Sequence, residues 1–93
     1  MIRLEVGNRV ITYKWAVVLQ WESIEKGTAN EYIFRDENCL PIIVITPDKI
    51  HMAEKLLDKV KELAGNRKKP VMIRITDEPY NWEKEGKQIV VFL

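Results

Sequence analysis

The chain of 93 residues contains one cysteine, one histidine, four scattered glycines and no long apolar run. The lone Cys39 cannot form an internal disulfide, and no spacing of Cys and His indicates a structural zinc site. No window approaches the roughly 20 apolar residues that span a bilayer, and the first residues lack the apolar stretch of a signal peptide. Single glycines form no phosphate-binding loop, so nucleotide binding is not indicated. We therefore expect a cytoplasmic protein without membrane contact and without a cofactor.

An excess of charge of one sign is also missing. The 15 Lys and Arg residues stand against 14 Asp and Glu residues, and a net charge of +1 provides no long-range attraction for nucleic acids or anionic lipids. The chain is 46% hydrophobic and 31% charged, which is typical of a folded globule. Its length fits a single domain over residues 1–93. Glutamine and serine are rare beside plentiful Lys, Glu, Ile and Val, which favours a thermophilic source.

Turn residues mark the first strands. Strand-like residues at 2–6 and 9–13 are separated by Gly7-Asn8, a pair that tolerates positive φ and suits a tight hairpin turn. A further short strand is expected over 31–35, around Tyr32 and Phe34. The chain is therefore expected to open with a β-hairpin.

The segment from Ile11 to Glu22 alternates in character. Its odd positions are apolar, which favours one long strand because side chains of a strand alternate between two faces. The alternative is a helix over 15–26 that ends at Gly27, since apolar residues here also recur at helical spacing. The alternation favours the strand.

An unbroken apolar run precedes an amphipathic segment. Residues 40–45 are rich in β-branched side chains and predict a central strand buried on both faces. Thr46-Pro47 then supplies an N-cap candidate and a proline at the first helical position. Apolar residues follow at intervals of three and four up to Ala64, and Gly65-Asn66 is a suitable end. This pattern predicts one long helix.

The remaining strand-like segments are 70–76 and 88–93. A helix between strands 40–45 and 70–76 favours a βαβ crossover with parallel strands. The sequence thus predicts an α+β fold. We expect a single mixed β-sheet of five to six strands, with an N-terminal hairpin or meander, a βαβ-like unit, a C-terminal strand and one long amphipathic helix packed on one face.

One helix cannot cover such a sheet. A segment of about 17 residues is roughly 25 Å long at 1.5 Å per residue and shields part of one face. Three candidates can cover the remaining sheet surface. They are a second helix within 15–26, the hairpin folded over as a second layer, and another copy of the chain. Residues 42–45 and 89–93 are apolar on both sides, and large apolar patches usually mark interfaces. We therefore predict a homodimer.

Acidic residues follow the two strands of the predicted crossover. Asp48, Asp77 and Glu78 are expected at the carboxyl edge of the sheet, where open α/β sheets bind ligands. Three carboxylates there form a candidate Mg²⁺ site for phosphoester chemistry. The structural explanation is stronger, since Asp48 complements the dipole at a helix start and Asp77-Glu78-Pro79 is ordinary turn chemistry.

The lone histidine and cysteine provide little chemistry. Asp48, His51 and Glu54 lie three residues apart, but helical geometry places His51 opposite the apolar stripe, in solvent. A catalytic pair would use Cys39 as the nucleophile and His51 as the base. No third group orients them, and a free cysteine is more often a small core residue.

A basic triplet and two aromatic residues complete the candidates. Arg67, Lys68 and Lys69 either complement the end of the helix or form a phosphate-contacting loop with aromatic stacking partners. Tyr80 and Trp82 lie in a long connection, 77–87, where they cap the sheet or present a partner-binding surface. Capping is the stronger interpretation.

The sequence lacks a coherent catalytic set and supplies material for an interface. We predict a small non-catalytic interaction or regulatory module that associates with itself through an apolar sheet face or edge strand. The alternatives are a nucleic-acid-binding protein that uses the basic triplet, and a phosphoesterase or nuclease that depends on a divalent metal. The sequence identifies no particular protein partner.

Overall fold

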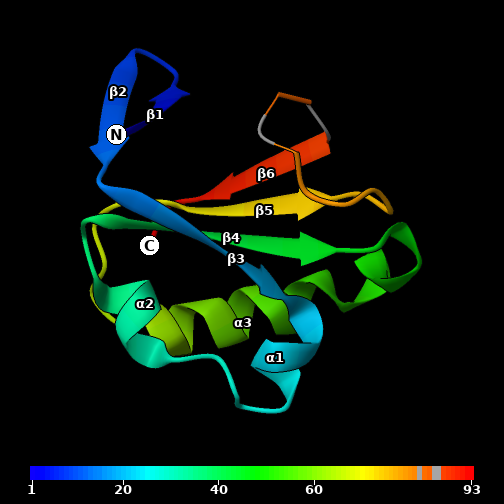
Figure 1. The fold of residues 1–93 in the computed structure, drawn as a ribbon. Helices are drawn as coiled ribbons and strands as arrows, with labels where there is room; N and C mark the ends of the chain where they lie inside the picture. The colour runs from blue at the N-terminus through cyan, green and yellow to red at the C-terminus, as the bar shows by residue number, and fades with distance from the viewer. Residues whose placement is uncertain (82, 85–86) are drawn as a thin grey trace.

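The computed structural model describes residues 1–81, 83–84 and 87–93 of an α+β fold (Figure 1). A mixed sheet has four strands in the order β3-β4-β5-β6, and a second sheet contains β1 and β2. In chain order the elements are β1 (Ile2–Val6), β2 (Arg9–Tyr13), β3 (Trp15–Gln20), α1 (Trp21–Glu25), α2 (Glu31–Arg35), β4 (Cys39–Ile45), the 3-10 helix η1 (Pro47–Met52), α3 (Ala53–Ala64), β5 (Val71–Ile75) and β6 (Lys87–Val91). Among the described residues, no helix combines the length and apolar character needed to span a membrane.

The predicted N-terminal hairpin is present. β1 and β2 are antiparallel, and the turn between Val6 and Arg9 contains Gly7 with a φ of +59°. Glycine at the first central position is the requirement of a type II′ turn, whose twist matches that of the strands. The hairpin does not join the main sheet as a fifth and sixth strand, as a single sheet would require. It forms a separate sheet instead.

The segment after the hairpin contains both a strand and a helix. The chain bends at Lys14, continues as β3 and turns into α1 at Trp21. One long strand over 11–22 is therefore wrong. In β2 the odd positions Ile11 and Tyr13 are buried, but β3 contains no fully buried residue. In α1, Trp21 and Ile24 are buried at helical spacing.

The strand predicted over 31–35 is also wrong, because this segment is helix α2. The Asn30 side chain accepts a hydrogen bond from the Tyr32 amide at 2.9 Å and caps the helix. Arg35 and Glu31 form an i,i+4 ion pair at 3.6 Å. Phe34 is fully buried. Local capping and one buried anchor therefore outweigh the strand preference of the aromatic residues.

The βαβ unit agrees with the prediction. β4 is parallel to both β3 and β5, and all seven of its residues are buried. β6 adds to β5 in the antiparallel sense. The connection from β4 to β5 starts at Pro47 as a 3-10 turn, continues as α3 and ends at Gly65 with a φ of +61°. Glycine suits this end because it adopts positive φ without strain.

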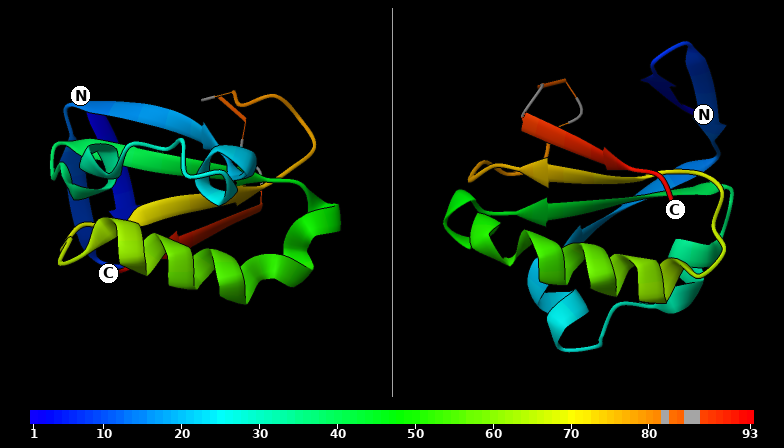
Figure 2. Two further views of the ribbon diagram at one scale, coloured as in Figure 1. Left: turned by 90° about the horizontal axis from the view of Figure 1, so that it is seen from below. Right: turned by 180° about the vertical axis from the view of Figure 1, so that it is seen from behind.

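The helices lie on one side of the four-stranded sheet, and the hairpin and the connection after β5 lie on the other (Figures 1 and 2). The core on the helix side is built around Phe34, Ile43, Ile45, Leu56, Val60 and Ile73. A smaller core on the opposite face joins the hairpin to the sheet and consists of Ile11, Tyr13, Leu40, Ile42 and Met72. The hairpin therefore covers one end of the second face.

Candidate functional site

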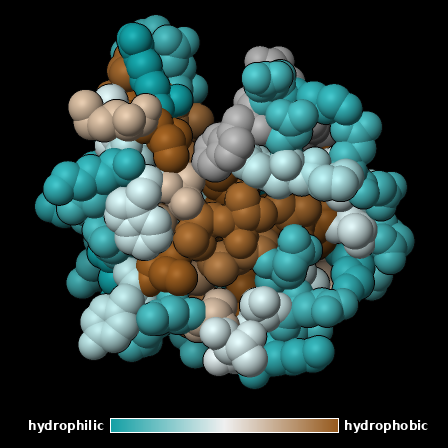
Figure 3. All heavy atoms as spheres, in the orientation of Figure 1, coloured by the Kyte–Doolittle hydropathy of each residue, from teal (hydrophilic) through white to brown (hydrophobic). Residues whose placement is uncertain are grey.

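The outer edge of β3 is the first candidate interface. β3 pairs with β4 on one side, and no strand in the described part of the chain pairs with its other side. Five of the six residues in the sequence Trp-Ala-Val-Val-Leu-Gln are apolar and none is charged. Trp15 is 40% exposed and Val18 is 37% exposed. Figure 3 shows an apolar surface over β3 and β4 on this side of the molecule.

Such an edge is unusual in an isolated protomer. An edge strand presents unpaired N–H and C=O groups, and soluble proteins commonly protect it with Lys, Pro or a bulge. β3 contains neither Lys nor Pro. The nearest charges are Lys14 before the strand and Glu22 after it, and both are exposed. The open hydrogen-bonding groups and the apolar side chains therefore occupy the same edge.

Arg67, predicted to contact phosphates, is a buried structural residue. It is 2% exposed, and its guanidinium donates hydrogen bonds to four main-chain carbonyl groups, those of Phe34, Asp36, Cys39 and Lys69. It ties the connection after α3 to α2 and to the start of β4. The sequence indicates only that Arg67 lies near the end of a helix. Its burial depends on contacts with residues 34–39, which are distant in the chain and leave no local pattern.

The two lysines of the triplet lie nearer the surface. Lys68 is exposed, and Lys69 is half-buried with its ammonium 5.2 Å from the centroid of the Tyr13 ring. Lys69 also donates to the Thr12 carbonyl oxygen at 3.4 Å. Nucleic-acid binding by this triplet stays a prediction, although the Arg67 guanidinium is already occupied by main-chain oxygens.

The carboxyl ends of β4 and β5 meet as the crossover predicts, because the Thr76 amide donates to the Ile45 carbonyl oxygen at 3.1 Å. A hydrogen bond from the Thr46 hydroxyl lowers the pKa of the Asp48 carboxyl. Glu78 lies 3.7 Å from the Lys84 ammonium, and its amide donates to the Thr76 hydroxyl. Among the described residues, no three or more acidic, Cys or His side chains lie close enough together to hold a metal ion. Asp48, Asp77 and Glu78 therefore do not form the predicted metal site.

Cys39 and His51 lie at opposite ends of β4. Cys39 is fully buried, and burial raises the pKa of its thiol to about 11. His51 is exposed in η1, where its Nδ1 lies 3.1 Å from the Asp48 carbonyl oxygen. A protonated thiol in the core, separated from the imidazole by the length of a strand, is typical of a structural cysteine.

The long connection after β5 brings a residue of the predicted binding set onto the sheet. Tyr80 packs against the smaller core, and its ring centroid lies 4.7 Å from the Arg74 guanidinium carbon. Burial raises the pKa of the Tyr80 hydroxyl. The sequence-based choice of sheet capping is consistent with this contact. Trp82, predicted with Tyr80, lies outside the described residues.

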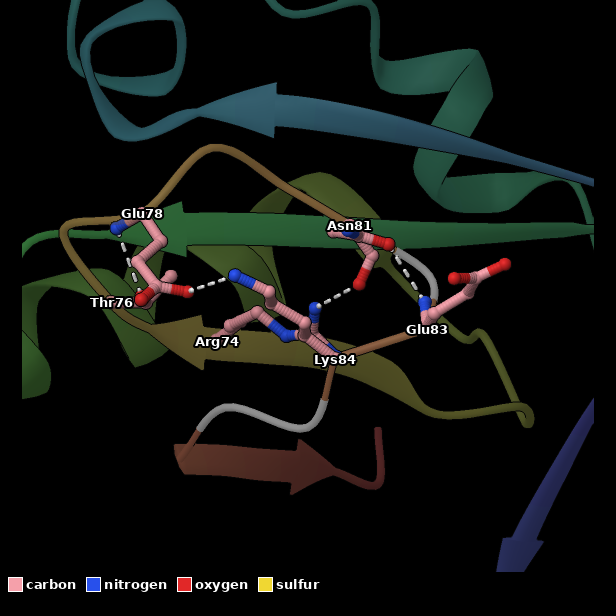
Figure 4. A network of polar contacts seen from close by, with 6 residues as sticks. All are labelled: Arg74, Thr76, Glu78, Asn81, Glu83 and Lys84. Atoms are coloured by element: carbon pink, nitrogen blue, oxygen red, sulfur yellow. Dashed lines mark hydrogen bonds and ion pairs between the residues drawn. The ribbon is translucent and has the colours of Figure 1, made fainter.

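Arg74 itself did not stand out in the sequence beyond its positive charge. In β5 it shares a face with Met72, two residues earlier, and this alternation could have indicated an arginine directed at the second face of the sheet. It is 6% exposed. Figure 4 shows its hydrogen bond to the Asn81 carbonyl oxygen and the separate ion pair of Glu78 with Lys84.

No protein-family model matches the chain, and no curated protein and no solved structure matches it either.

Proposed function

We propose that the protein is a non-catalytic interaction module that associates with a second copy of itself through the outer edge of β3. The supporting observation is an uncharged, apolar strand at the edge of the sheet with its hydrogen-bonding side open. Pairing of two such strands satisfies the main-chain groups of both copies. A single sheet of eight strands then passes through both subunits.

The charges next to β3 favour an antiparallel pair. Lys14 and Glu22 each lie four residues from Val18, on opposite sides. Lys14 precedes β3 and Glu22 follows it in the first turn of α1, so an antiparallel pair brings the basic end of each strand toward the acidic end of the other. Glu22 is exposed and makes a weak surface contact with Lys49 at 3.8 Å, which pairing can replace. The edge is thus complementary to itself in charge as well as in apolar character.

The edge also carries apolar side chains that a second copy can cover. Trp15 is 40% exposed and Val18 is 37% exposed, although both belong to a strand of the main sheet.

The molecular mass of the protein in solution tests this proposal. Size-exclusion chromatography with light scattering is expected to give twice the monomer mass at micromolar concentration for the wild-type chain. Val18→Lys places an ammonium group on the paired edge of each copy and is expected to give the monomer. Val10→Lys is the matched control, since Val10 is 50% exposed on the hairpin, away from β3, and should leave the dimer intact.

A charge exchange tests the antiparallel orientation. Lys14→Glu and Glu22→Lys are each expected to weaken the dimer several-fold, because each places like charges across the pair. The double variant restores opposite charges and should recover the affinity. A wild-type chain that stays monomeric at high concentration overturns the proposal. A dimer that survives Val18→Lys shows that the contact lies elsewhere.

A further inference from the structure

Two arginines are buried in the described structure, and their surroundings differ. The guanidinium of Arg67 donates to four carbonyl oxygens. That of Arg74 donates to one, the Asn81 oxygen, at 3.4 Å, and its Nε has no acceptor. The Tyr80 ring lies against the Arg74 guanidinium, a favourable contact that supplies no negative charge.

No carboxylate of the described residues pairs with Arg74. A buried cation is costly unless it is paired and hydrogen-bonded, and removal of its charge is then favourable. The incomplete set of acceptors indicates that an anion completes the site.

A cavity of about 190 Å³ lies beside Arg74, between the hairpin and the connection after β5. Its apolar walls come from β1, β4 and β5, through Leu4, Leu40 and Met72. Arg3 and Lys84 line it as well. Three cations and no carboxylate therefore face this cavity from the described residues. Two acids pair with the outer cations at the surface, Glu5 with Arg3 at 3.9 Å and Glu78 with Lys84 at 3.7 Å.

The lining selects a class of ligand. A guanidinium edge matches the two oxygens of a carboxylate, and such charge-assisted pairs are the strong ones. Leu4, Leu40 and Met72 offer an apolar surface on which a small hydrocarbon body can pack beside the cations. The volume is below the roughly 300 Å³ at which pockets for drug-sized molecules begin. The ligand is therefore small.

We propose that this cavity binds a small monocarboxylate with an apolar body, with its carboxylate on Arg74 and its hydrocarbon part against Leu4, Leu40 and Met72. The proposal is independent of self-association, because the cavity lies on the second face of the sheet and β3 does not line it.

The test compares an acid with its neutral counterpart. Titration of ¹⁵N-labelled protein with phenylacetate is expected to shift the amide resonances of Leu4, Arg74 and Tyr80, with a Kd about tenfold or more below that of phenylacetamide, which has the same shape without the charge. Inorganic phosphate at the same concentration should leave these resonances in place, because it lacks the apolar body.

Variants separate binding from folding. Arg74→Met is expected to abolish the response to phenylacetate and to leave the melting temperature of the ligand-free protein equal or higher, since it removes a buried charge that no described carboxylate pairs. Lys68→Met removes an exposed cation away from the cavity and should change neither. Equal shifts with acid and amide, an equal response to phosphate, or an Arg74→Met variant that still binds phenylacetate overturns the proposal.

Discussion

The Nη1 of Arg67 donates a hydrogen bond to the carbonyl oxygen of Phe34, 3.0 Å away and 33 residues earlier in the chain. The same guanidinium donates to the Asp36, Cys39 and Lys69 carbonyl groups. This one side chain therefore supplies hydrogen-bond donors to the main chain of two neighbouring segments, residues 34–39 and the connection after α3. Its positive charge is solvated by carbonyl dipoles, and no acidic side chain in the described part of the chain forms an ion pair with it.

Arg67→Met is expected to lower the free energy of unfolding by about 3 kcal/mol or more, because it leaves several buried carbonyl groups without a donor. Arg67→Lys should be intermediate, since an ammonium lacks the planar fork that reaches separate acceptors. Urea unfolding followed by tryptophan fluorescence measures both. Lys68→Met, at the exposed neighbour, should change stability by less than about 0.5 kcal/mol. An equal effect at both positions contradicts this role.

The Cys39 thiol is expected to be inert in the folded protein. It is fully buried, and burial raises its pKa to about 11, so little thiolate is present at pH 8. Ellman's reagent should react slowly with the native chain and stoichiometrically in denaturant. Rapid reaction under native conditions would show that the start of β4 opens readily.

Stability is expected to fall as the pH rises from about 9 to 11. The thiol of the unfolded chain ionises near its ordinary pKa of 9.0, while in the folded chain it holds its proton up to about pH 11. The unfolded state thus binds fewer protons in this window, and the free energy of unfolding decreases with pH. Burial raises the pKa of Tyr13 as well, with the same sign. Cys39→Ala should remove up to about 2 kcal/mol of this loss at pH 11.

Asn30→Ala is expected to lower the free energy of unfolding by about 1 kcal/mol, because it removes the acceptor for the Tyr32 amide at the start of α2. Asn30→Asp preserves an acceptor and should remain close to the wild type. Thermal unfolding by circular dichroism measures both variants. A loss of equal size in Asn30→Asp would place the role of Asn30 outside capping.

The elements found correctly from the sequence are those whose signal is local and repeated. The stripe that ends at Ala64 and the glycine after it mark a helix, and the run over 40–45 marks a strand with neighbours on both sides. Tyr32 and Phe34 favour a strand over 31–35, and five residues are too few for a helical period to show. Their helix depends on the Asn30 cap and on the burial of Phe34, which is a tertiary contact.

The candidate sites likewise combine features that are visible in the sequence with features that depend on the tertiary structure. The apolar character of β3 is visible in the sequence, but its place at an edge follows from strand order, which no local pattern fixes. Arg67 and Arg74 are both arginines near predicted strands. Their burial, and the difference in their acceptors, depends on loops that cross from distant parts of the chain.

The hairpin is joined to the rest of the chain at the bend of Lys14 and adheres through one end of the second face. It can therefore open locally while the helices remain packed on the other face. Amide protons of β1 are expected to exchange with deuterium well before those of β4, whose exchange requires global unfolding. The difference between the two exchange rates measures how stably the hairpin packs on the sheet. A ligand bound in the cavity beside Arg74 should slow exchange of the β1 amide protons.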